Sequence, residues 1–152
     1  MLQRLQTLFL LVIAILSGLL FLLPVAKFIV TDGGTFEFYA DRVMEVTPEG
    51  SAFVARNIYS MILTIVSGVL PLIVIFMYKK LLMQIRFVIV EVVLQGGLLF
   101  LLWLQCNNLS NDAEILFQIA LMFPVVNVIL CLLSIRQIGK DVALLKSYDR
   151  IR

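Results

Sequence analysis

Four apolar stretches separated by shorter polar segments dominate the hydrophobic pattern of this chain. Each contains few charged residues and is long enough, at 1.5 Å per residue in a helix, to cross about 30 Å of hydrocarbon. They cover approximately residues 8–26, 58–78, 87–104 and 115–135. The pattern predicts an all-α membrane protein, a four-helix transmembrane bundle, in which residues 1–152 form a single integral membrane domain.

The polar segment at residues 27–56 lies between the first two apolar stretches. Its β-branched and aromatic residues flank Asp32-Gly33 on both sides, a pattern typical of a β-hairpin. Residues 43–46 predict a short third strand. Thr47-Pro48-Glu49 has the cap, the proline and the acid that mark the start of a helix. We therefore expect a small β-hairpin followed directly by the second helix.

Lysine and arginine are distributed unevenly between the two ends of the predicted helices. If the N-terminus is cytoplasmic, the outer side has Lys27, Arg42 and Arg56, and the inner side has the other nine basic residues. Cytoplasmic segments of membrane proteins carry such an excess. This bias predicts cytoplasmic N- and C-termini and an extracytoplasmic hairpin. The inner basic residues are Arg4, Lys79, Lys80, Arg86, Arg136, Lys140, Lys146, Arg150 and Arg152.

Residues 137–152 predict an amphipathic tail on the inner side. Apolar side chains recur on one helical face, and basic residues supply a positive charge that suits an inner leaflet. Such a tail either anchors the topology or docks a cytoplasmic or membrane partner. The candidate interaction residues are Lys140, Asp141, Lys146, Asp149, Arg150 and Arg152.

Composition supports the membrane prediction and excludes several kinds of chemistry. Hydrophobic residues make up 62% of the chain and charged residues only 14%, against roughly 45–50% and about 25% in soluble domains. The absence of histidine removes the commonest general base and metal ligand. A net charge of +2 is too small to indicate nucleic-acid binding. With no catalytic, metal or phosphate-binding motif in the sequence, we expect no enzyme activity, cofactor or metal.

Glu91 is the one ionisable residue well inside a predicted span, five residues beyond Arg86. That spacing places it about 8 Å deeper along the helix. Ionisable groups inside membranes are costly and are therefore hypotheses of function. Glu91 either forms an ion pair with a partner such as Arg4 or Arg136, packs as a protonated carboxyl, or belongs to a proton or cation relay.

Two amide side chains accompany Glu91 in the predicted bundle. Gln95 lies one helical turn further along the same face. Asn127 lies at the matching depth of the fourth span, so an interhelical hydrogen bond worth about 1 kcal/mol is expected between the two amides. This arrangement either holds the helices together or forms an intramembrane polar site.

The two ends of the chain resemble a known family. The sequence opens with Met1-Leu2-Gln3-Arg4-Leu5-Gln6-Thr7 and closes with Lys140-Asp141, Leu144-Leu145-Lys146-Ser147 and Asp149-Arg150-Ile151-Arg152. With four spans in about 150 residues, it resembles an uncharacterised family of four-span inner-membrane proteins from the Bacteroidota, a domain of unknown function. The resemblance covers the whole chain and implies a bacterial inner membrane, but no known reaction.

Two hypotheses of function are consistent with these patterns. The first is a non-enzymatic assembly, scaffolding or accessory subunit, whose partners are the lipid bilayer and either another membrane protein or further copies of the chain. The alternative is a small transporter or channel component that uses Glu91 and Gln95 as its polar centre.

Overall fold

The structure is a computed structural model that describes residues 3–30, 34–47, 50–77, 80–109 and 113–149. Four α-helices and five strands follow one another in these segments. They are α1 (Gln3–Leu19), β1 (Ala26–Val30), β2 (Thr35–Phe38), β3 (Arg42–Thr47), β4 (Gly50–Arg56), α2 (Ile58–Phe76), α3 (Leu81–Leu109), β5 (Ala113–Phe117), a short 3-10 helix η1 (Ile119–Met122) and α4 (Phe123–Asp149).

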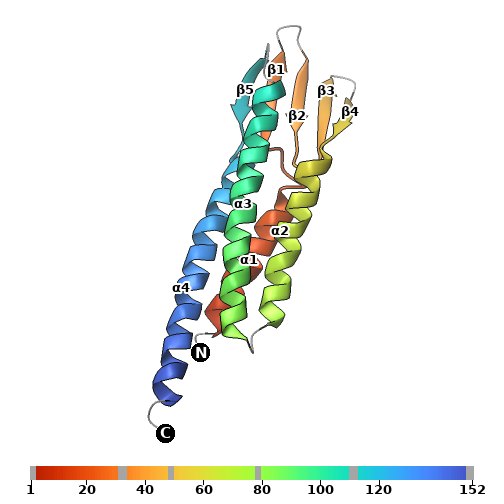
Figure 1. Cartoon of the computed structure of the whole chain (residues 1–152). Helices are drawn as coiled ribbons and strands as arrows, with labels where there is room; N and C mark the ends of the chain where they lie inside the picture. The colour runs from red at the N-terminus through yellow and green to blue at the C-terminus, as the bar shows by residue number, and fades with distance from the viewer. Residues whose placement is uncertain (1–2, 31–33, 48–49, 78–79, 110–112, 150–152) are drawn as a thin grey trace.

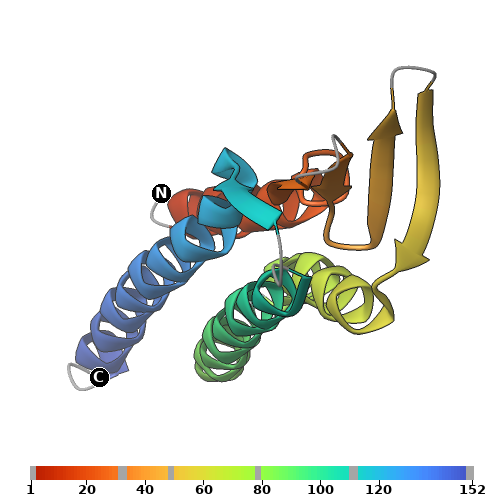
Figure 2. The same ribbon diagram turned by 90° about the horizontal axis from the view of Figure 1, so that it is seen from above.

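The strands form one antiparallel sheet of five strands in the order β4-β3-β2-β1-β5. The sheet lies at one end of the molecule, and the start of α1 and the end of α4 lie at the other (Figure 1). Viewed from above, the β3–β4 hairpin extends sideways past the helices (Figure 2). The predicted four-helix bundle with a small hairpin is therefore wrong, because the sheet is a substantial second part of the fold.

The helix in the first apolar stretch is shorter than predicted. Helix α1 ends at Leu19, and β1 begins at Ala26. Pro24 lies between them, and the residue before a proline is disfavoured in the helical conformation. Within the described segments, three helices are long and apolar enough to cross a membrane, namely residues 58–76, 81–108 and 119–144, whereas the apolar part of α1 is shorter.

The predicted fourth span also begins with a strand. Strand β5 pairs with β1 from Val30↔Ala113 to Ala26↔Phe117, and α4 begins only at Phe123. Residues Ile115 to Phe117 are β-branched, aliphatic and aromatic, so they fit a pleated surface next to another strand as well as they fit a helix. Hydrophobicity alone does not separate these two outcomes.

The helix start predicted at Thr47-Pro48-Glu49 is wrong, because strands lie on both sides of residues 48–49. Thr47 ends β3 and is paired with Gly50, which begins β4, while residues 48–49 lie outside the described segments. Gly50 has a φ of 144°, which glycine adopts without the strain of a side chain. The hairpin predicted around Asp32-Gly33 is present as β1 and β2, although its turn residues 31–33 also lie outside the description.

The predicted tail is the C-terminal part of α4. This helix continues for 27 residues, about 40 Å, from Phe123 to Asp149. Ile138 is fully buried in a cluster that Val142 also contacts, so this part of α4 packs along the molecule. Residues 150–152 lie outside the described part of the chain.

The buried positions recur at spacings of three or four residues in each helix, the pattern of left-handed helix packing. They include polar residues in every helix, whereas leucine, isoleucine and valine occupy many of the exposed positions. The buried sets are Gln6, Leu10, Ile13 and Ser17 in α1; Ser60, Thr64, Ser67, Pro71 and Val74 in α2; Gln84, Val88, Glu91, Gln95, Leu98, Leu102 and Cys106 in α3; and Pro124, Asn127, Cys131, Ser134 and Ile138 in α4.

Candidate functional site

Four polar side chains from three helices meet inside the helical part of the molecule. We call Ser17, Glu91, Gln95 and Asn127 the polar layer; each is at most 1% exposed. An apolar cluster that includes Leu20 and Leu98 lies on the sheet side of the layer, and one that includes Ile13 and Val88 lies on the other side. The layer is therefore enclosed by apolar packing along the helix axes.

Ser17 connects the three helices of the polar layer. The Gln95 Nε2 atom donates hydrogen bonds to Glu91 Oε1 at 2.8 Å and to Ser17 Oγ at 3.3 Å. The Asn127 Nδ2 atom donates to the same Ser17 Oγ at 3.2 Å. The two amides share Ser17 as acceptor, and no direct bond between Gln95 and Asn127 of the expected kind is present among these contacts.

Glu91 has no positively charged partner among the described residues. Its Oε2 atom is buried and makes no hydrogen bond. The ion pairs of the described segments are Lys27–Glu37 and Arg42–Asp41, both in the sheet region. Arg86 and Arg136 are exposed on the helices, so the predicted pairing with Arg136 is not formed, and the Arg4 side chain lies outside the description.

The carbonyl oxygens of the two amides are also left without partners. Gln95 Oε1 and Asn127 Oδ1 are buried and accept no hydrogen bond in the described structure. The buried hydroxyls of α2 differ, because Thr64 Oγ1 donates to Ser60 O at 2.7 Å and Ser67 Oγ to Thr64 O at 3.1 Å. Hydroxyl groups can donate hydrogen bonds to backbone carbonyls of their own helix, whereas the polar layer retains acceptor atoms without hydrogen bonds.

A close approach of α1 and α2 supports the position of Ser17. A Cβ atom at Gly68 would lie 3.7 Å from Ser17 Cβ, whereas one at Gly18 would meet nothing within 4 Å. The absence of a side chain at Gly68 lets α1 lie against α2 at the depth of the polar layer. Small residues have this role in membrane helix packing.

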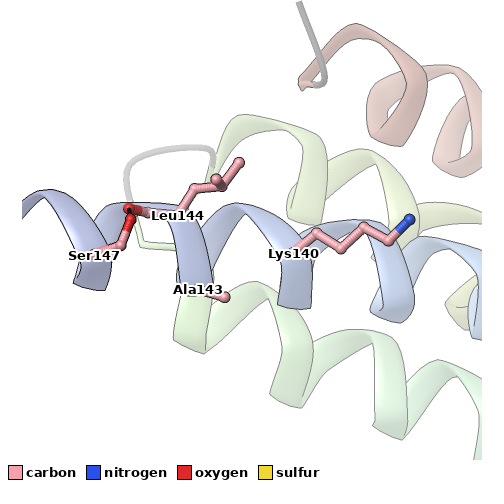
Figure 3. A pocket seen from close by; sticks show the side chains of 4 residues that line it. All are labelled: Lys140, Ala143, Leu144 and Ser147. Carbon is pink, nitrogen blue, oxygen red and sulfur yellow. Dashed lines mark hydrogen bonds between the residues drawn. The ribbon is translucent and has the colours of Figure 1, made fainter.

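The predicted tail residues are divided between an internal contact and a surface. Asp141 accepts a hydrogen bond of 2.5 Å from Gln6 Nε2, which joins α4 to α1. Lys140, Ala143, Leu144 and Ser147 line a surface pocket near the end of α4 (Figure 3). Lys146 and Asp149 belong to α4, but their side chains, and all of Arg150 and Arg152, lie outside the described structure.

Several buried polar residues escaped the sequence prediction. Gln6, Gln84 and Ser134 lie inside the helical part, and Gln84 Nε2 donates to Val74 O at 2.9 Å. Each falls on the same three- and four-residue spacing as the predicted Glu91, Gln95 and Asn127. That periodicity was the signal that could have identified them.

The part of the chain that the structure describes contains no group of three or more His, Cys, Asp or Glu residues placed to hold a metal. Cys106 and Cys131 are both buried free thiols. The chemistry that the layer offers is therefore oxygen acceptors and one carboxyl group.

Comparison with known families identifies the relationship of the chain. The model of DUF4293, a domain of unknown function, matches residues 2–151. The chain therefore belongs to the DUF4293 family, and the prediction of an uncharacterised family is confirmed. No curated protein matches the chain significantly.

Proposed function

We propose that this member of the DUF4293 family is an integral protein of a bacterial inner membrane and acts as a non-enzymatic assembly or accessory subunit. The membrane location rests on the burial pattern of the helices, in which polar side chains face inward and apolar side chains face outward. In α2, Ser60 and Ser67 are fully buried, whereas Ile62 and Phe76 are 52% and 81% exposed. Lipid solvates such an apolar surface, whereas water does not.

The charges favour one orientation in that membrane. Arg86, Arg136 and Lys140 belong to the parts of α3 and α4 at the end opposite the sheet, and Lys80 directly precedes α3 there. Cytoplasmic ends of spanning helices carry such an excess of basic residues. We propose that the ends of the chain face the cytoplasm and that the sheet lies outside it.

Strand β4 supports the assembly role. It is the edge of the sheet, all seven of its residues are exposed, and the first six carry no charge. Phe53 and Val54 are 58% and 50% exposed. An uncharged, exposed edge strand is a template for pairing with another chain. We propose that its occupant is an extended segment of a partner membrane protein.

Purification in mild detergent after crosslinking in native membranes tests this role. A stoichiometric partner or a homo-oligomer supports a subunit, and a monomer without a partner contradicts it. Phe53→Lys should reduce recovery of the partner at least tenfold. The matched control is Ile29→Lys, which alters an exposed apolar residue of the interior strand β1. Equal losses in both variants would contradict binding at β4.

The unpartnered oxygens of the polar layer favour a second candidate, a small transporter or channel component centred on Glu91 and Gln95. It predicts an ion-linked flux in proteoliposomes that Glu91→Gln abolishes. Flux no greater than in empty liposomes would contradict this candidate. Tolerance of Glu91→Leu would indicate a packing role.

A further inference from the structure

The polar layer contains more hydrogen-bond acceptors than donors. Glu91 Oε2, Gln95 Oε1 and Asn127 Oδ1 are all buried without a partner. The amide N–H groups already donate to Glu91 and Ser17. Turning the Gln95 amide would place its oxygen against the Glu91 carboxyl, and two acceptors in contact again require a proton or cation between them.

The charge of an ionised Glu91 would also be uncompensated. Neither α1 nor α2 contributes an ionisable side chain to the layer, since their residues there are Ser17 and Gly68. From α4, the Cys131 thiol interacts electrostatically with Glu91. A thiol supplies no positive charge, and an isolated carboxylate in a nonpolar interior is costly.

We propose that the polar layer binds one monovalent cation at Glu91, either an exchangeable proton on the carboxyl group or a dehydrated Na⁺ ion. One positive charge balances the single carboxylate, whereas a divalent ion would leave a net charge in the apolar interior. Carboxylate, amide and hydroxyl oxygens are suitable ligands for both ions, and membrane proteins bind H⁺ and Na⁺ between helices in this way.

The two apolar clusters make this an occluded site. Leu20 and Leu98 lie toward the sheet, and Ile13 and Val88 lie toward the other end. Exchange of the cation therefore requires the helices to move apart on one side. This inference uses the membrane location given under Proposed function, but it needs neither the partner at β4 nor a flux.

Labelling with dicyclohexylcarbodiimide tests the site, because this apolar reagent adds to protonated carboxyl groups within membranes. The purified full-length protein in liposomes is treated over a series from about pH 4 to about pH 9. Mass spectrometry then measures the N-acylurea adduct at Glu91. Parallel series contain NaCl, KCl or choline chloride at equal ionic strength.

Two results support the proposal and identify the cation. For a proton site, the initial labelling rate falls about tenfold per pH unit above a midpoint and is the same in all three salts. For a Na⁺ site, NaCl lowers labelling at constant pH at least tenfold, and KCl and choline chloride do not. No adduct at Glu91 at any pH, or labelling independent of both pH and Na⁺, overturns the proposal.

A matched variant separates this site from an ordinary intramembrane carboxyl group. Val93 is 69% exposed on the same helix at nearly the same depth, so Glu91→Gln combined with Val93→Glu moves the carboxyl group to the outer surface. Its labelling should be insensitive to Na⁺ and should have a different pH midpoint. Ser17→Ala, which removes the shared acceptor, should change either the apparent acid dissociation constant of Glu91 or the Na⁺ concentration that protects it, in each case at least threefold.

The labelling experiment can fail independently of the proposed function. Protease protection of the same liposomes reports insertion, and crosslinking reports the partner. An unlabelled Glu91 in a correctly inserted protein would overturn the cation site and leave the assembly role intact.

Discussion

Glu37 in the sheet and Glu91 in the helices each bind a neighbouring side chain, but only Glu37 has a cation beside it. Lys27 Nζ lies 2.8 Å from Glu37 Oε1, and the two residues are direct partners across β1 and β2. Glu91 has only the Gln95 amide four residues along its own helix. Cross-strand pairing thus compensates one charge, whereas the helix interior leaves the other carboxyl group without a counter-charge.

The electrostatic surroundings of Glu37 follow from this pairing. The hydrogen bond from Lys27 is the main reason that the pKa of Glu37 is lowered, and the Tyr39 hydroxyl, which donates at 2.9 Å, acts in the same direction. Burial is the main reason that the pKa of Tyr39 is raised, and its bond to Glu37 adds to this. The sheet therefore stabilises an ionised carboxylate.

The strongest test of the comparison introduces a lysine at each glutamate. Glu91→Lys should lower the free energy of unfolding by about 3 kcal/mol, because a buried ammonium group would have no acidic partner. Glu37→Lys should cost less than about 1 kcal/mol, since the pair at Lys27 is partly exposed. Denaturant unfolding in mixed micelles measures both. Equal effects would contradict the difference between the two sites.

A second test disturbs the packing on which only the polar layer depends. Gly68→Leu should destabilise the protein by about 2 kcal/mol, because its side chain would push α1 and Ser17 away from Gln95 and Asn127. Gly18→Leu is the control, since space is open there, and it should change stability by less than about 1 kcal/mol. Thermal unfolding in detergent distinguishes the variants.

Removing one donor from each glutamate gives a smaller difference. Gln95→Leu leaves Glu91 Oε1 and Ser17 Oγ without their shared donor and should cost about 1 kcal/mol. Tyr39→Phe removes a donor from Glu37, which keeps Lys27, and should cost only about half as much. A larger loss for Tyr39→Phe in the same unfolding assay would reverse the comparison.

The smallest expected effect is the pH dependence at Glu37. Because its folded pKa lies below the ordinary glutamate value of 4.5, the ionised form contributes stability above about pH 4.5. That contribution disappears as the pH falls through the folded pKa. The stability difference between wild type and Glu37→Gln should therefore be under about 1 kcal/mol at neutral pH and vanish in acid. A difference that grows in acid would contradict this sign.

The sequence predicted the helices best where an apolar stretch was uninterrupted. The second and third stretches correspond to α2 and α3, whereas the helix of the first stretch ends early at Leu19 and the fourth stretch begins within β5. Strands β1 and β5 pair with each other over a separation of more than 80 residues, and no local pattern encodes such a distant partner. Strand β4 was not predicted, because Thr47-Pro48-Glu49, directly before it, has the composition of a helix start.

The polar residues of the site were easier to locate than their contacts. Glu91, Gln95 and Asn127 stood out because each is a polar residue within an apolar stretch. Ser17 did not, since a serine beside a glycine is typical of close helix packing. Its role as shared acceptor depends on the rotation of α1 against α3 and α4, which only the folded structure specifies.

The position of β5 has a mechanical consequence for the helices. Because β1 follows α1, β4 precedes α2, and β5 connects α3 to α4, the sheet fixes the spacing of all four helices at one end. At the other end, α2 and α3 are joined by a short connection, and α1 and α4 by the Gln6–Asp141 bond. The helices are therefore connected at both ends, by the sheet at one end and by these two links at the other. The most extensive helix packing is between α3 and α4 and between α1 and α2, so a movement that took Gln95 and Glu91 away from Asn127 and Ser17 would have to break the contact between α3 and α4.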